Sequence, residues 1–101
     1  MNKFKYTAMA VKWWDKVNGN TYHSVRITRH RDGKILCCPF TYGNGHYCKR
    51  TALSAMADAG WLPVKYRDQT SYWQYEPDNS YPILWLISEG RKRECVANGK
   101  E

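Results

Sequence analysis

The sequence predicts an α+β domain built on an antiparallel sheet, and three observations support this. From about residue 4 to residue 42 apolar side chains alternate with polar ones, the pattern of half-buried strands. Asn18-Gly19 and Asp32-Gly33 interrupt this alternation, and both dipeptides favour the positive φ of tight hairpin turns. After residue 45 the apolar spacing becomes that of a helix. We therefore expect a three-stranded meander, one helix at about 46–59, and two or three further strands.

The first strand is expected to contain a bulge. Even-numbered positions are apolar from Phe4 to Ala10, whereas odd-numbered positions are apolar from Val11 to Trp13. Because successive side chains point to opposite faces of a strand, these two sets are out of phase. A bulge near residues 10 and 11 would bring both sets onto one face.

The next two strands are expected at residues 21–31 and 36–42. The first should bury one face and leave the other polar and basic. The buried face is expected to hold His23, Val25 and Ile27, and the outer face Tyr22, Ser24, Arg26, Thr28 and His30. The second strand contains Pro39, which has no N–H for a β-ladder. We therefore expect that strand at a sheet edge or at a bulge.

The helix at about 46–59 carries an apolar stripe from Cys48 to Ala59 at spacings i, i+4, i+7, i+8 and i+11. Gly60 can supply the left-handed residue that ends a helix, and Trp61 can fold back onto the last turn. Three more strands are expected, at 72–76, 82–87 and 91–96.

The length and composition of the chain predict one intracellular domain. The 101 residues suffice for a single core, so we expect one domain over residues 1–101. The longest apolar run, Tyr81 to Ile87, is far shorter than the roughly 20 residues of a membrane-spanning helix. The N-terminus also lacks the apolar core of a signal peptide. We therefore expect a cytoplasmic protein with no membrane partner and with four cysteines that are buried thiols.

Positive charge is concentrated in the N-terminal third. Residues 1–34 contain eight Lys or Arg against two Asp, a net charge of +6, while the other 67 residues add only +1. Such a concentrated positive field attracts phosphate groups. Lys49 and Arg50 stand at the expected helix start, where acidic residues normally complement the helix dipole, and this arrangement suits a docked anion. The alternative is that these cations only face solvent.

These charges predict one basic face that binds nucleic acid. We expect it to consist of Arg26, Arg29, Arg31, Lys34, His46, Lys49 and Arg50. Three aromatic residues with basic neighbours are candidates for stacking on unpaired bases, with packing or solvent exposure as the alternative: Trp14, Tyr22 and Tyr47. The other tryptophans are expected in the core: Trp13, Trp61, Trp73 and Trp85.

Residues 20–59 resemble the second half of a double-stranded-RNA-binding domain. They place strands before a Gly43-x-Gly45 turn and a helix that begins with Lys49 and Arg50 and continues with alanines. In that family the basic helix start binds phosphates across a groove and recognises shape more than sequence. The family's first helix is missing here, and Leu53 stands where a third lysine is expected.

Two strings resemble a group of small, largely uncharacterised bacteriophage proteins with the same strand-strand-helix order. They are NGNTYHSVR, from Asn18 to Arg26, and PFTYGNG, from Pro39 to Gly45. This resemblance implies a host-takeover protein that acts in the host cytoplasm. Small phage proteins of this kind often bind and block a bacterial machine.

The sequence therefore predicts a non-enzymatic phage-type accessory protein, without cofactor or metal, whose basic face binds nucleic acid or a host nucleoprotein. The alternative is a protein–protein inhibitor, similar to anti-CRISPR proteins, that blocks the nucleic-acid-binding surface of a bacterial defence complex. A third hypothesis is a small enzyme with Cys48 as nucleophile and His23, His30 or His46 as base, although no known catalytic motif occurs. A zinc cluster of Cys38, His46 and Cys48 matches none of the usual ligand spacings.

Overall fold

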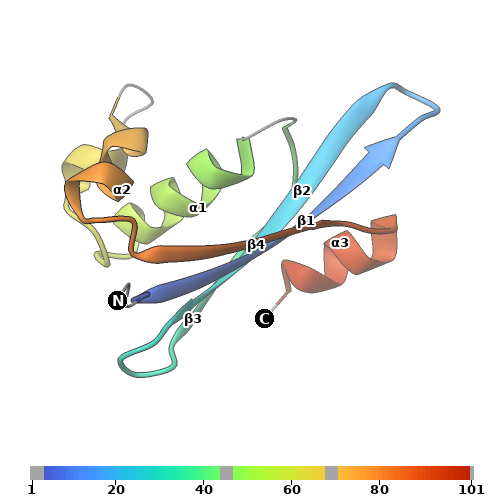
Figure 1. Ribbon diagram of the computed structural model, residues 1–101. Helices are drawn as coiled ribbons and strands as arrows, with labels where there is room; N and C mark the ends of the chain where they lie inside the picture. The colour runs from blue at the N-terminus through green and yellow to red at the C-terminus, as the bar shows by residue number, and fades with distance from the viewer. Residues whose placement is uncertain (1–3, 44–46, 68–70, 101) are drawn as a thin grey trace.

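Three strands come first in the chain, helices follow, and a fourth strand lies between the last two helices, as Figure 1 shows. The computed structural model describes residues 4–43, 47–67 and 71–100. The first part consists of β1 (Tyr6–Asp15), β2 (Asn20–Arg29), β3 (Ile35–Tyr42) and α1 (Tyr47–Asp58). The second part consists of η1 (Val64–Arg67), η2 (Tyr72–Gln74), α2 (Tyr75–Asp78), β4 (Ile83–Glu89) and α3 (Lys92–Asn98). This order confirms the predicted α+β class.

The strands form one mixed sheet in the order β3-β2-β1-β4. The meander β1-β2-β3 is antiparallel and reverses at the predicted turns, whereas β4 runs parallel to β1. The prediction of a purely antiparallel sheet is therefore wrong at β4. Because α1 and the short helices lie between β3 and β4 in the chain, β4 does not enter the sheet through a hairpin, and parallel pairing becomes available.

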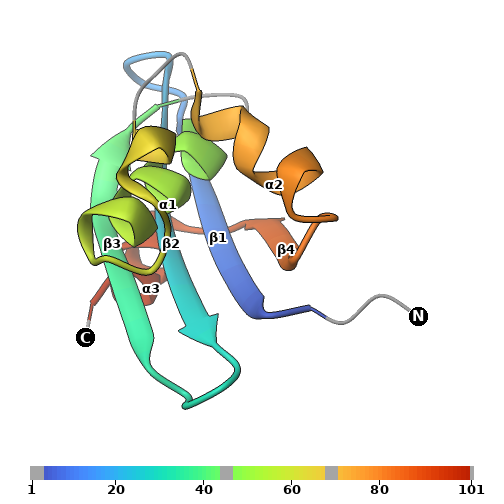
Figure 2. The same ribbon diagram turned by 90° about the vertical axis from the view of Figure 1, so that its left-hand side faces the viewer.

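Helices lie on both faces of the sheet (Figure 2). This explains why the apolar positions of β1 change from even-numbered to odd-numbered residues. Tyr6, Ala8 and Ala10 are buried in the core that α1 covers. Val11 lies at α3 instead, where the Cys95 thiol donates to its carbonyl at 3.2 Å. β1 pairs with β2 without interruption along its whole length. The predicted bulge at residues 10 and 11 is therefore wrong, because each half of the alternation faces a different helix.

The irregular strand is β3. As predicted for the strand that contains Pro39, it lies at an edge of the sheet and its pairing is interrupted. The register with β2 shifts between the pairs His23–Thr41 and Val25–Cys38. The shift gives β3 one residue more than β2 around Pro39, so the missing N–H does not break a regular ladder.

Two segments predicted as strands are helical. Residues 72–76 belong to η2 and α2, and residues 91–96 lie mainly in α3. The Glu94 carboxylate accepts a hydrogen bond from the Arg91 N–H at 2.7 Å and so caps the start of α3. Tyr75 is buried in the core from α2. Over such short segments, apolar spacing alone does not distinguish a strand from a helix.

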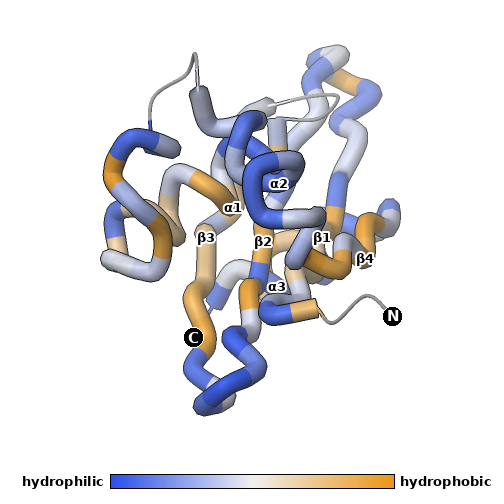
Figure 3. The backbone as a smooth tube through the Cα atoms, turned by 60° about the vertical axis from the view of Figure 1, so that its left-hand side comes forward, coloured by the Kyte–Doolittle hydropathy of each residue, from blue (hydrophilic) through white to orange (hydrophobic). Residues whose placement is uncertain are grey.

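The core lies between α1 and the sheet. Its fully buried side chains include Val25, Ile27, Leu53 and Met56. Trp61 and Trp85 pack against this core as predicted, but Trp73 is 56% exposed and the prediction for it is wrong. The β2–β3 turn is strongly hydrophilic (Figure 3). Within the described residues, no helix is both long enough and apolar enough to span a membrane.

Candidate functional site

The predicted basic residues do not form one face. Arg26 lies on the α3 side of the sheet, where Nε donates to the Asn98 carbonyl at 3.3 Å and Nη2 donates to the Lys100 carbonyl. Its guanidinium therefore satisfies carbonyls at the end of α3. His46 lies outside the described residues.

Lys49 and Arg50 lie at the start of α1 and lean in different directions. The Lys49 Nζ is 5.3 Å from the centre of the Trp85 ring, on the β4 side of the helix. The Arg50 Cζ is 5.0 Å from the centre of the Tyr47 ring. Arg50 also lines a hollow of about 430 Å³ between α1 and β3, together with the acidic Asp58. Each cation thus packs on its own aromatic ring, and the two do not point at a common ligand position.

Gly43, before α1, is packed against two aromatic rings. The His23 Nδ1 donates to the Gly43 carbonyl at 3.1 Å, and the Thr51 hydroxyl lies 2.8 Å from His23 Nε2. A Cβ at Gly43 would lie 2.7 Å from the Tyr47 ring and 2.8 Å from the His23 ring. Burial lowers the pKa of His23, so the neutral ring accepts the Thr51 hydrogen bond. We call His23, Gly43, Tyr47 and Thr51 the helix-start cluster.

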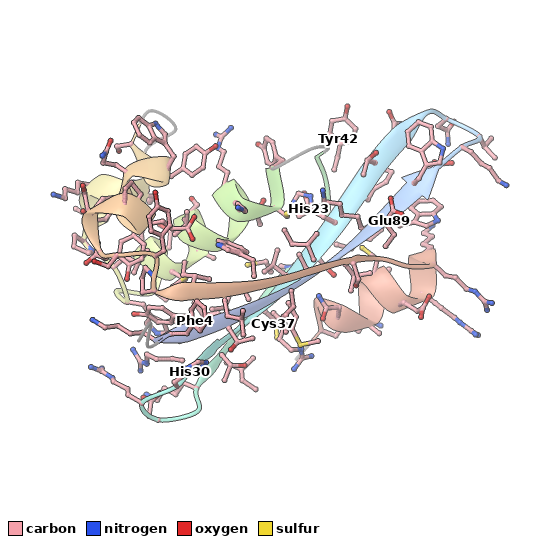
Figure 4. All side chains as sticks on the ribbon, in the orientation of Figure 1. Phe4, His23, His30, Cys37, Tyr42 and Glu89 are labelled. Atoms are coloured by element: carbon pink, nitrogen blue, oxygen red, sulfur yellow. The ribbon has the colours of Figure 1, made fainter. Side chains whose placement is uncertain are left out.

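Arg29 and Arg31 come together at the opposite end of α1. There a cavity of about 650 Å³ opens between the start of β1, the end of β2 and the residues after α1, a volume typical of ligand sites. Its lining residues, which we call the basic pocket, are Phe4, Lys5, Tyr6, Arg29, His30, Arg31, Gly60 and Trp61. Lys34 lies in the adjoining β2–β3 turn. Figure 4 shows Phe4 and His30 at this end of the sheet, and His23 and Tyr42 toward the other.

The end of α1 positions Trp61 as a wall of the basic pocket. The Gly60 N–H donates to the Ala57 carbonyl at 3.1 Å, and the Trp61 N–H donates to the Met56 carbonyl at 2.9 Å. With Gly60 at φ +78°, these bonds form a Schellman motif, which confirms the predicted helix end. The chain therefore turns back, and the Trp61 ring stacks on Tyr6 with centroids 6.0 Å apart.

Arg29 holds two neighbours in place. Its Cζ lies 4.5 Å from the centre of the Trp61 ring, and its Nε and Nη2 donate to the Asp32 carboxylate at 3.1 and 2.7 Å. This bidentate pair lowers the pKa of Asp32 to about 2 and raises the pKa of Arg29. Arg29 is therefore neutralised by a permanently ionised carboxylate at neutral pH, and its role is to position Trp61 and the turn.

Three cations near the basic pocket lack such a partner. Lys5, Arg31 and Lys34 are exposed, and none forms an ion pair with a described residue. The charges of Arg29 and Asp32 cancel, so Lys5, Arg31 and Lys34 give the region around the basic pocket a local charge of about +3. Closely spaced, hydrated cations beside a cavity can bind an anion without first breaking an internal ion pair.

Sequence reasoning missed Lys5, Phe4, Tyr6 and His30 as site residues and assigned Trp61 to the core. The His30 ring links the two strands, since its Nδ1 donates to the Phe4 carbonyl at 2.8 Å and its Nε2 lies 2.7 Å from the Thr7 hydroxyl. A usable signal was present in the first hairpin. A turn at Asn18-Gly19 sets a register that pairs Tyr6 with Arg29, and thereby places Lys5 near His30.

The candidate stacking residues differ in how accessible their rings are. Tyr22 stacks between Trp13 and Phe40 at centroid distances of 5.6 and 4.8 Å, so neighbouring rings already cover its faces. Trp14 is 56% exposed, and Tyr47 is 42% exposed with Arg50 over its ring. Base stacking by Trp14 and Tyr47 stays a prediction, whereas Tyr22 packs between two neighbouring rings of the sheet.

The structure gives no geometric support to the two cysteine hypotheses. Cys48 lies on the buried face of α1 and is only 1% exposed. Burial raises the pKa of the Cys38 thiol to about 11. The predicted zinc cluster includes His46, which lies outside the described residues. Among the residues that the structure does describe, no group of three His, Cys, Asp or Glu is placed to hold a metal ion.

Comparison with known proteins identifies no relative. The chain matches no protein-family model, no curated protein and no solved structure. The resemblances to phage proteins and to double-stranded-RNA-binding domains therefore stay predictions.

Proposed function

We propose that the protein is a non-enzymatic nucleic-acid-binding protein and that the basic pocket is its phosphate-binding site. One observation carries this proposal: Lys5 and Arg31 line a cavity of about 650 Å³, Lys34 lies in the adjoining turn, and all three are exposed and form no ion pair with a described residue. The proposal covers bare nucleic acid and the nucleic acid of a host nucleoprotein, since both present the same phosphates.

Phosphates, more than bases, are the expected points of contact. Tyr6 and Arg29 both pack on the Trp61 ring, so this tryptophan is the rigid wall of the pocket rather than a stacking surface for bases. Lys5 and Arg31 then contact successive phosphates, and Lys34 adds a third positive charge from the turn. Contacts of this kind position a strand without reading its sequence.

The test is the salt dependence of binding to fluorescently labelled RNA and DNA, single-stranded and duplex, measured by anisotropy. Three phosphate contacts predict a slope of log affinity against log salt of about −2 to −3, and the double variant Lys5→Ala/Arg31→Ala should reduce that slope by about two units. Lys16→Ala is the matched control, because Lys16 is exposed in the β1–β2 turn at the far end of the sheet.

Two results would contradict the proposal. One is the absence of binding to any of these nucleic acids at low salt. The other is an unchanged slope in Lys5→Ala/Arg31→Ala. Stoichiometric capture of a bacterial defence complex that survives nuclease treatment, together with no binding to free nucleic acid, would instead support the inhibitor hypothesis.

A further inference from the structure

β4 is an outer strand with a free edge. The sheet ends at β4 on one side and at β3 on the other, and β4 pairs with β1 alone among the described strands. Figure 2 shows β4 as the last strand on the side away from β3. Along such an edge, alternate residues direct their backbone N–H and C=O groups outward, and these groups can pair with another strand.

The two edges differ in their protection against such pairing. β3 contains Pro39 and a register shift, and Lys34 stands directly before it. From Ile83 to Ser88, β4 contains no proline, no glycine and no charged residue. Glu89, at the end of β4, is its only charged residue, so the stretch 83–88 lacks the protections that natural edge strands normally carry, and this indicates that another strand covers it.

Apolar side chains are exposed on both faces of the β4 edge. Leu86 is 47% exposed on the α3 side of the sheet, beside Met9 of β1, which is 46% exposed and is its register partner. Ile87, which follows Leu86 and so points to the other face, is 40% exposed. A strand added at this edge would cover apolar surface on both sides of the sheet.

We propose that the β4 edge pairs antiparallel with the β4 edge of a second copy of this chain, with a two-fold axis at Leu86. Leu86 is the middle residue of Ile83–Glu89, so this register uses the whole strand. It places Trp85 opposite Ile87 of the second copy, an aromatic and β-branched pair of the kind that stabilises antiparallel strands. The same patch is used by both copies, so the assembly closes as a dimer.

Charges at the two ends of β4 favour the antiparallel direction. A basic segment, Arg91 to Arg93, follows β4 and, with Glu89 and Glu94 beside it, gives this end a net charge of +1, whereas Glu76 and Asp78 of α2 precede the strand. None of these groups forms an ion pair with a described residue. Antiparallel pairing brings the basic end of one copy to the acidic end of the other, twice per dimer, whereas parallel pairing would bring like charges together.

The expected dimer is reversible. A contact of seven residues on each side, from Ile83 to Glu89, is small compared with the roughly 20–30 residues a side of a standard stable interface. We therefore expect association in the micromolar range, with a molar mass in solution that rises with protein concentration.

Sedimentation velocity or light scattering of the full chain over a concentration series tests this inference. The wild type should shift from monomer to dimer, and Leu86→Lys should stay monomeric, because it places a charge at the two-fold axis. Ile35→Lys is the matched control: Ile35 is 50% exposed on the opposite edge strand, and this variant should dimerise like the wild type.

The register has its own test. Under mild oxidation Leu86→Cys should form a covalent dimer that the wild type, with its four native thiols, does not form. A wild type that is monomeric at the highest concentrations, a Leu86→Lys variant that dimerises, or an equal loss in Ile35→Lys would each overturn the inference. It does not depend on the proposed function, since no β4 residue lines the basic pocket, and folded, monomeric Leu86→Lys should still bind oligonucleotides.

Discussion

The first turn of α1 carries Lys49 and Arg50, while Lys5 and Arg31 flank the cavity beyond its last turn. The first pair is adjacent in sequence and lies beside a glycine loop, yet each cation packs on a different aromatic ring. Lys5 and Arg31 are separated by a whole hairpin and meet only because β1 pairs with β2. Adjacency in sequence therefore predicts a shared ligand position less well than strand register does.

The two ends of α1 thus differ: one is packed internally, and the other is where we propose that phosphate binds. In the helix-start cluster His23 is buried and both of its ring nitrogens are hydrogen-bonded, so this ring has little capacity left for a ligand. The basic pocket has a formed wall, an internally paired Arg29 and exposed cations that form no ion pair with a described residue.

Gly43→Ala should have the largest effect. The new Cβ would overlap the rings of His23 and Tyr47, and overpacking of this kind costs roughly 2–3 kcal/mol of the free energy of unfolding. Gly33→Ala in the β2–β3 turn is the comparison. At Gly33 the new Cβ would have no atom within 4 Å, so the only cost is that of a side chain at a φ of 73°, about 1 kcal/mol of the free energy of unfolding. Urea denaturation measures both, and equal losses would show that the helix-start cluster is not tightly packed.

His23 should make stability depend on pH. Because burial holds the folded-state pKa of His23 below its ordinary 6.5, the unfolded chain binds the proton more readily. Stability should be complete above about pH 6.5 and should fall as the pH drops toward the folded-state pKa. His23→Gln should remove this part of the decline in melting temperature, while His30→Gln should keep it. A decline that persists unchanged in His23→Gln would assign the effect to another group.

Asp32→Asn should have the smallest effect. It removes the carboxylate that neutralises Arg29 and so adds one positive charge beside the basic pocket. Affinity for a single-stranded oligonucleotide should rise about threefold at low salt, and the salt slope should steepen by up to about one unit. Weaker binding would show that Arg29 must be held by Asp32 for the pocket to keep its shape.

Local signals in the sequence predicted much of the fold. Asn18-Gly19 and Asp32-Gly33 define the meander, and the Gly60-Trp61 pair defines the end of α1, because each of these depends on residues close in the chain. Pro39 correctly indicated an irregular edge strand. These features need no knowledge of tertiary contacts.

Features that depend on distant contacts were not predicted. The parallel pairing of β4 with β1, and α3 on the second face of the sheet, require knowledge of what covers each face. For the same reason the two phases of β1 suggested a bulge. The candidate site was predicted only in part. Arg29, Arg31 and Lys34 lie at or beside the basic pocket, but Arg26 donates to a carbonyl at the end of α3, and Lys5 was overlooked.

The most direct measurement compares two double variants for binding to the same labelled oligonucleotide at about 0.1 M salt: Lys5→Ala/Arg31→Ala and Lys49→Ala/Arg50→Ala. Both remove two positive charges, so they differ only in which end of α1 loses them. We predict that the first weakens binding by roughly tenfold per lost contact and that the second weakens it less than about threefold. Equal losses, or a larger loss in Lys49→Ala/Arg50→Ala, would contradict the assignment of the phosphate-binding site to the basic pocket.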